Sequence, residues 1–186
     1  MPVQEPYVPP LEIDGEVIEF THLEPFQMMV PSKKARKNLQ VHVRYTNHCF
    51  SRGLHDGENN ISEDVFPDQH GNPRKFCPDR FALSLELRRY LVDLNDPRAQ
   101  VKQTAEERNW VYIVRLESPK GPYYVFFEIK RTPKTSPDDL HMIVESAYQL
   151  TPGYGEPKIR EGKMGFQLLC GKTYLRQPAF TVKGKS

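Results

Sequence analysis

The chain has 186 residues, 38% of them hydrophobic, and a formal net charge of only +2. This length fits one domain, predicted over residues 16–175, with a flexible Pro-rich lead-in at residues 1–15 and a tail at residues 176–186. No apolar run approaches the ~18 residues of a membrane span, and no secretory leader is evident. We therefore expect a soluble cytoplasmic protein with no membrane partner, in which the three cysteines are reduced.

The N-terminal third predicts three strands. Two short ones are expected at Glu16–Phe20 and Phe26–Val30. Leu39–Thr46 then alternates apolar and polar residues. This alternation indicates a half-buried strand whose polar face carries His42 and Arg44.

The middle of the chain combines a long irregular segment with a helix. Residues 51–80 are rich in Gly, Asp, Asn and Pro, which predicts a long loop or a subdomain excursion. Ser84–Leu94 follows with an apolar stripe at helical spacing, and Ser84 is the expected N-cap. A second, polar helix is predicted over residues 97–108, with Asp96 as its cap.

The C-terminal half shows the clearest strand pattern. Trp110–Leu116 and Tyr123–Arg131 flank a turn-rich segment, which indicates a hairpin. Two further strands are predicted at His141–Leu150 and Met164–Gly171. Together the elements predict an α+β fold, an antiparallel meander of four or more strands with one principal helix packed on a face and a long Gly/Pro-rich loop.

Positive charge is concentrated locally. Residues 30–55 contain no Asp or Glu but hold six cations and three of the six histidines. A cationic surface with imidazoles suits a polyanion and acid–base chemistry near neutral pH. The alternative interpretation is that the basic run at residues 33–37 is a solvated loop. We predict RNA as a partner, contacted by Lys33, Lys34, Arg36, Lys37, Arg44 and Lys130.

RNA cleavage without a metal needs a base, an acid and cations that stabilise the phosphate. His42 and His48 are the acid–base candidates and Arg52 is the expected phosphate clamp. Ser146 is the one hydroxyl on an otherwise apolar strand face, and Tyr148 on the same strand could stack on a base. Each of these side chains also has a purely structural interpretation, as part of a solvated face, a satisfied loop or the core.

A zinc site is the alternative role for the cysteines. The candidate ligands are Cys49, His55, His70 and Cys77. Their separations do not match the short cysteine knuckles of typical zinc sites, and free cysteines are usually buried as small hydrophobes. The primary expectation is therefore that the protein needs no cofactor.

Two strand segments resemble a known group of enzymes. Tyr123–Lys130 followed by Met142–Tyr148, after a helix, is similar to the paired strands of phage-borne members of the barnase–EndoU–colicin–RelE group of ribonucleases and toxins. The resemblance implies a metal-independent endoribonuclease or toxin, with an immunity or antitoxin protein as a further partner. It supplies no catalytic set, because neither the Lys–Arg–Tyr set of RelE-like toxins nor the Glu–Arg–His set of barnase can be matched by position.

A broader pattern covers most of residues 40–175. Four segments resemble parts of uncharacterised bacterial and prophage proteins, some labelled heat shock protein C: Cys49–Arg52, Phe76–Arg80, Leu83–Ser84 and Ser146–Tyr148. That label implies no mechanism. The alternative function is a non-catalytic module that binds protein or nucleic acid, as an adaptor, inhibitor or defence component.

Overall fold

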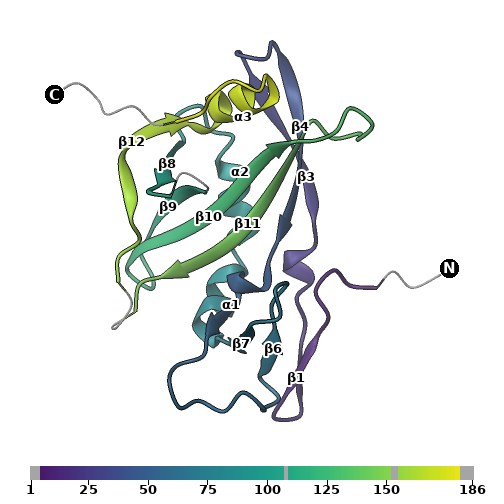
Figure 1. The fold of residues 1–186 in the computed structure, drawn as a ribbon, viewed down its shortest axis with the longest axis vertical. Helices are drawn as coiled ribbons and strands as arrows, with labels where there is room; N and C mark the ends of the chain where they lie inside the picture. Colours follow the sequence, from purple (N-terminus) through teal and green to yellow (C-terminus); the bar gives the residue numbers. More distant parts are fainter. Residues whose placement is uncertain (1–4, 107–108, 152–154, 181–186) are drawn as a thin grey trace.

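A seven-stranded mixed sheet dominates the structure, a computed structural model that describes residues 5–106, 109–151 and 155–180 (Figure 1). The strand order is β12-β8-β9-β10-β11-β4-β3. Neighbouring strands are antiparallel except β11 and β4, which are parallel. The bounds are β3 (Phe26–Ser32), β4 (Lys37–Tyr45), β8 (Gln100–Thr104), β9 (Trp110–Leu116), β10 (Gly121–Arg131), β11 (Leu140–Gln149) and β12 (Ile159–Gly165).

The predicted antiparallel meander with one principal helix is wrong. The consecutive strands β9, β10 and β11 do form a meander, but β4 joins it in parallel from the N-terminal third of the chain. The described residues hold three α-helices, so no single helix dominates. The error has a simple cause, because hydrophobic alternation identifies strands but does not encode which distant strand pairs with which.

The helices also differ from the prediction. The expected helix Ser84–Leu94 is divided into α1 (Pro78–Ser84) and α2 (Leu87–Asp93). Ser84 is the last residue of α1 rather than a cap, and its hydroxyl donates to the Phe81 carbonyl. The apolar stripe of this region is buried as expected. No helix in the described ranges has the length and apolar composition that crossing a membrane requires.

Two further predictions fail near the ends of strands. Residues 97–108 contain β8 rather than a polar helix, although residues 107–108 lie outside the described part of the chain. Met164–Gly171 was expected to be a strand, yet β12 ends at Gly165 and α3 (Phe166–Tyr174) begins there. Phe166, Leu169 and Cys170 of α3 are buried, but an apolar run this short does not distinguish a helix from a strand.

Helices α2 and α3 cover the same face of β10. Tyr90 of α2 packs against Tyr123, and Phe166 of α3 packs against Phe127, each pair with ring centroids 6.0 Å apart. Figure 1 shows α2 behind β10 and β11. We call the face that contacts these helices the helix face and the opposite one the outer face.

The segment predicted as a long loop, residues 51–80, contains a small sheet. Its order is β5 (Ser51–Gly53), β7 (Pro73–Phe76) and β6 (Val65–Pro67), and α1 follows. Lys75 contacts both Glu58 at 3.7 Å and Asp64 at 3.4 Å, so acidic side chains of this segment pair internally. A two-stranded hairpin, β1 (Leu11–Ile13) and β2 (Glu16–Ile18), stands beside it, and β1 falls within the expected lead-in.

Candidate functional site

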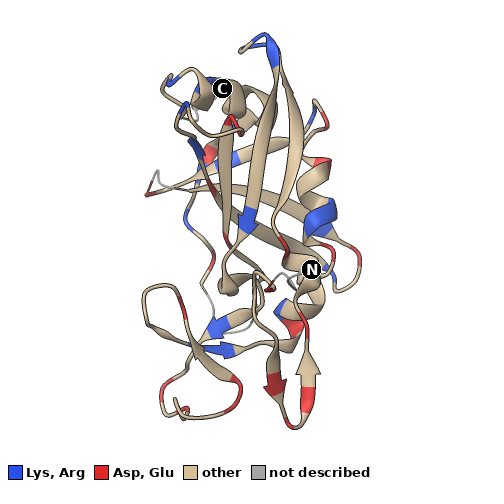
Figure 2. Ribbon diagram, turned by 90° about the vertical axis from the view of Figure 1, so that its right-hand side faces the viewer, with Lys and Arg blue, Asp and Glu red and all other residues tan. Residues whose placement is uncertain are grey.

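The predicted basic residues lie at both ends of the molecule. Lys33, Lys34 and Arg36 are exposed in the turn between β3 and β4. Figure 2 shows this basic tip at the top of the molecule and the basic strands of the small sheet at the bottom. The nine residues of β4 separate the two ends by about 30 Å at roughly 3.3 Å per residue. The stretch that is continuous in sequence is therefore not one surface.

Lys37, at the start of β4, is already engaged in contacts. Its Nζ donates to Asp139 at 2.8 Å and lies 5.1 Å from the centroid of the Tyr174 ring. The hydrogen bond to Asp139 raises the pKa of Lys37, so the side chain stays charged. Lys37 ties the β3–β4 hairpin to the segment before β11 and to α3.

His42 lies on the outer face, midway along β4, the strand next to the sheet edge. The parallel register pairs it with His141, and the two ring centroids are 5.6 Å apart. His42 Nδ1 is 3.9 Å from Asp138 Oδ2. Arg44 and Lys130 share this face by register, and Lys130 pairs with Glu128 at 2.8 Å.

A β-bulge decides where Ser146 lies. Phe127 pairs with Val144 but Phe126 pairs with Ser146, which leaves Glu145 as an extra residue in β11. A bulge of this kind reverses the alternation beyond it. Regular alternation predicted Ser146 on the same face as Val144. Because of the bulge, Ser146 lies on the outer face instead.

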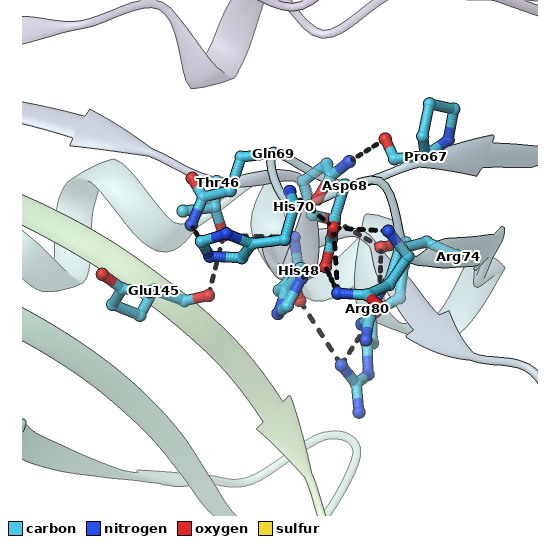
Figure 3. Close-up of polar contacts among 12 residues, drawn as sticks. Thr46, His48, Pro67, Asp68, Gln69, His70, Arg74, Arg80 and Glu145 are labelled. Atoms are coloured by element: carbon cyan, nitrogen blue, oxygen red, sulfur yellow. Dashed lines mark hydrogen bonds and ion pairs between the residues drawn. The ribbon is translucent and has the colours of Figure 1, made fainter.

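His48 lies just beyond the end of β4, in the 3-10 helix η2 (Asn47–Cys49). Thr46 caps η2, since its hydroxyl accepts from the His48 N–H at 3.2 Å and donates to the Glu145 carbonyl at 2.7 Å. The His48 ring nitrogen Nε2 is 3.1 Å from Asp68 Oδ2 (Figure 3). His48 thereby connects two segments: its backbone N–H reaches the bulge in β11 through Thr46, and its imidazole contacts Asp68 in the turn after β6.

Asp68 is an ionised carboxylate held by backbone groups. Its Oδ1 accepts hydrogen bonds from the N–H groups of His70 at 2.8 Å and Asn72 at 2.9 Å. Burial raises its pKa, but these hydrogen bonds and the one with His48 outweigh burial and hold the pKa far below its ordinary value. An ionised carboxylate only accepts hydrogen bonds, so His48 Nε2 must carry the proton.

The second ring nitrogen of His48 is then available as a base. Burial, followed by the positive charge of Arg74, lowers the pKa of His48, while Asp68 raises it less strongly. The imidazole is therefore neutral near pH 7, with its lone pair on Nδ1. This atom makes no hydrogen bond within the described part of the chain, and the side chain is 29% exposed.

Two arginines converge beside His48. Arg74 Nη2 and Arg80 Nη1 both donate to the Ser51 carbonyl, at 2.9 and 2.8 Å. Arg80 Nη1 also lies 3.4 Å from the His48 carbonyl, and its guanidinium lies 4.8 Å from the Tyr148 ring centroid. Both arginines and Asp68 were missed by sequence reasoning, because they come from a segment whose pattern predicts a loop.

Arg52, the predicted phosphate clamp, is paired differently. Its Nη1 and Nη2 contact the two oxygens of Glu58 at 2.7 and 2.6 Å, and Arg52 holds the pKa of Glu58 down at about 2. With Arg80, Arg52 lines a pocket of about 630 Å³ between α1 and the end of β11. Both arginines therefore line one pocket, whose lining residues do not include His48.

The four predicted zinc ligands do not form a metal site. Cys49 is fully buried, its Sγ contacts the Val144 carbonyl at 3.7 Å, and burial raises its pKa to about 12. His55 and His70 are exposed, and Cys77 directly precedes α1. In the described ranges no group of three or more His, Cys, Asp or Glu residues is arranged to hold a metal ion.

The buried histidines predict how stability depends on pH. Burial is the main cause that lowers the pKa of His22, His48 and His141 below 6.5. The unfolded chain therefore binds more protons, and their stabilisation is complete above about pH 6.5 and lost as pH falls through the lowered values. We expect the urea midpoint to be lower at pH 5.5 than at pH 7.5, before the carboxylates titrate. An equal or higher midpoint at pH 5.5 would contradict this assignment.

Comparison with known proteins identifies the family. A model of the YjaZ family matches residues 10–174, which is most of the chain, so the protein belongs to the YjaZ family. No curated protein and no solved structure matches. The family match covers the seven-stranded sheet and the small sheet, and it therefore includes His48, Asp68 and both converging arginines.

Proposed function

We propose that this YjaZ family protein is an endoribonuclease that cleaves RNA without a metal, with His48 as its general base. The observation that carries the proposal is the contact between His48 Nε2 and the ionised Asp68 carboxylate. This contact fixes the tautomer that leaves the lone pair on Nδ1. The lowered pKa of His48 keeps that lone pair unprotonated near neutral pH.

The acid–base step needs only one imidazole. A 2′-hydroxyl that attacks its adjacent phosphate can lose its proton to His48 Nδ1, and the same proton can return to the departing 5′-oxygen. Asp68 stabilises the imidazolium between these two transfers, because its charge lies 3.1 Å from Nε2. The O2′–P bond forms as the P–O5′ bond breaks, so the products are a 2′,3′-cyclic phosphate and a free 5′-hydroxyl, and no water is consumed.

The cations beside His48 match the charge that develops on the phosphate. Arg80 uses only Nη1 for hydrogen bonds within the described ranges, so Nε and Nη2 remain to bind a phosphate oxygen. Arg74 adds positive charge close enough to lower the pKa of His48. Such fixed cations stabilise a transition state most where water is partly excluded. Ser146 and Tyr148 lie on the outer face near this site, where they would contact the substrate.

Loss of the base is the direct test. In His48→Gln we expect cleavage of total RNA, in the presence of EDTA, to fall roughly 100- to 10,000-fold, since general acid–base catalysis contributes about that much. His42→Gln is the matched control, because His42 also lies beside a carboxylate but on the far part of the sheet. Product bands on denaturing gels and single-turnover rates are the measurements, and urea unfolding confirms that both variants fold.

The outcomes separate the proposal from its alternatives. Wild-type cleavage that His48→Gln retains would remove His48 from the mechanism. Equal losses in both histidine variants would place the reaction at the middle of the outer face instead. Intact RNA at a large excess of wild-type protein would contradict the nuclease proposal and favour a non-catalytic binding module.

A further inference from the structure

Three aromatic rings lie together on the outer face, and only Tyr148 among them has a place in the proposed function. Tyr124 and Phe126 of β10 and Tyr148 of β11 have ring centroids 5.4 to 6.3 Å apart. Their planes differ by only 20 to 40°. We call these three residues the aromatic patch. Phe126 stacks against both tyrosines, so the three rings form one packed aromatic cluster.

The register explains why the rings gather there. Tyr124 pairs directly with Tyr148, and Phe126 pairs with Ser146 across the bulge. The residues between them on β10, Tyr123 and Val125, are buried on the helix face. Tyr124 and Tyr148 stay partly exposed while Phe126 is 8% exposed, so the two tyrosines supply the accessible part of the aromatic patch.

The aromatic patch is continuous with the proposed catalytic site. The Arg80 guanidinium lies 4.8 Å from the Tyr148 ring centroid, and its Nη1 reaches the His48 carbonyl at 3.4 Å. Arg80 thus links the His48 backbone to the aromatic patch. Both aromatic rings and guanidinium planes stack on unpaired nucleobases.

Charge on the same face favours a nucleic acid over an apolar partner. Arg44 lies beside Ile143, which in turn pairs with Glu128, and Lys130 pairs with His141. Lys130 lies four residues along β10 from Phe126, about 13 Å at roughly 3.3 Å per residue, and Arg44 lies two strands from β10, so these cations share the face of the aromatic patch at a distance from its rings. Glu128 and Glu145 lie among them, so the face is mixed in charge and suited to bases as much as to phosphates.

We infer that the aromatic patch is a nucleobase platform that binds single-stranded RNA next to the phosphate held at Arg80. The inference rests on the proposed function for the identity of the nucleic acid. Paired bases in a duplex hide the faces that stacking requires, so the platform selects unpaired RNA. Stacking on a ring is tolerant of sequence, because every base has an aromatic face.

The test measures binding without cleavage. The probe is a fluorescein-labelled RNA oligonucleotide with 2′-O-methyl groups throughout, which has no 2′-hydroxyl to attack its phosphates. By anisotropy we expect Tyr124→Leu and Tyr148→Leu each to weaken binding roughly 5- to 100-fold. Tyr148→Phe keeps the ring and should bind as the wild type does. Tyr112→Leu is the matched control, because Tyr112 pairs with Val125 and faces the helices.

Each result decides the question. Weaker binding by the leucine variants, with Tyr148→Phe and Tyr112→Leu unchanged, supports the platform even if the wild type cleaves nothing. Equal binding by all variants, or equal binding of the duplex of the same sequence, overturns it even if RNA is cleaved. If a leucine variant fails to fold, the binding measurement on that variant is replaced by photo-crosslinking of a 5-iodouridine RNA probe to the wild-type protein. Crosslinks in β10 or β11 support the platform, and crosslinks confined to residues 33–37 overturn it.

Discussion

Asp68→Asn is expected to reduce RNA cleavage by about 100- to 10,000-fold while leaving the fold in place. In the wild type Asp68 Oδ1 accepts from two backbone N–H groups, those of His70 and Asn72, and Oδ2 faces His48 Nε2. An asparagine keeps its one oxygen on the two N–H groups, so its NH2 group must face His48. His48 Nε2 would then accept, its proton would move to Nδ1, and the base would be lost.

The tautomer of His48 tests whether Asp68 orients the imidazole. If Asp68 only stabilised the fold, Asp68→Asn would leave the tautomer of His48 unchanged. Nitrogen-15 NMR of the imidazole distinguishes a proton on Nδ1 from one on Nε2. We expect the proton of His48 on Nε2 in the wild type and on Nδ1 in Asp68→Asn. Asp138→Asn is the matched control, because Asp138 lies beside His42, and it should keep full activity. A wild-type rate in Asp68→Asn would show that the carboxylate does not orient the base.

The pH dependence of the wild-type cleavage rate should reflect the titration of His48. Because burial and Arg74 lower the pKa of His48, the acid limb of the rate profile should have its midpoint below 6.5. Above that midpoint the rate should reach a plateau that extends through neutral pH. An acid limb centred above 6.5 would indicate that a group other than His48 is the base.

Much of the sheet could be predicted from local patterns. Trp110–Leu116 is a strand with the predicted bounds, and Leu39–Thr46 and Tyr123–Arg131 differ from β4 and β10 by one or two residues at an end. Leu39–Thr46 alternates cleanly, and its apolar residues are buried in β4, whereas the other two segments were identified by the turn-rich segment between them. The parallel contact of β4 with β11 could not be predicted, because it joins segments about 100 residues apart.

The site was accessible to sequence reasoning only in part. His48 stood out because an imidazole within a basic stretch suits acid–base chemistry. Its partner Asp68 is 20 residues away, and only the turn after β6 brings the two side chains together. The outer-face position of Ser146 depends on the bulge at Glu145, and the residue types around this position do not indicate a bulge.

Gly171→Ala is expected to lower the free energy of unfolding by about 1–2 kcal/mol, or roughly 3–6 °C in Tm. Gly171 lies in α3, and a Cβ there would come within 2.4 Å of Ser32 Oγ and 2.7 Å of Lys34 Cβ. Ser32 cannot yield easily, because it is buried and its hydroxyl accepts from the Ala35 N–H at 3.1 Å. The overpacking outweighs the gain of up to about 1 kcal/mol that alanine brings to a helix.

Helix propensity alone predicts that Gly171→Ala raises the free energy of unfolding, whereas the close approach of α3 to the β3–β4 turn predicts that it lowers it. Gly155→Ala is the matched control, because its Cβ would meet no atom within 4 Å and its backbone needs no positive φ. We expect that variant to unfold within about 0.5 kcal/mol of the wild type. Gly171→Val should destabilise more than Gly171→Ala, because its larger side chain displaces the β3–β4 turn further. If both Gly171 variants were as stable as the wild type in urea, α3 would not dock closely on that turn, and the basic tip at residues 33–36 would not be held against it.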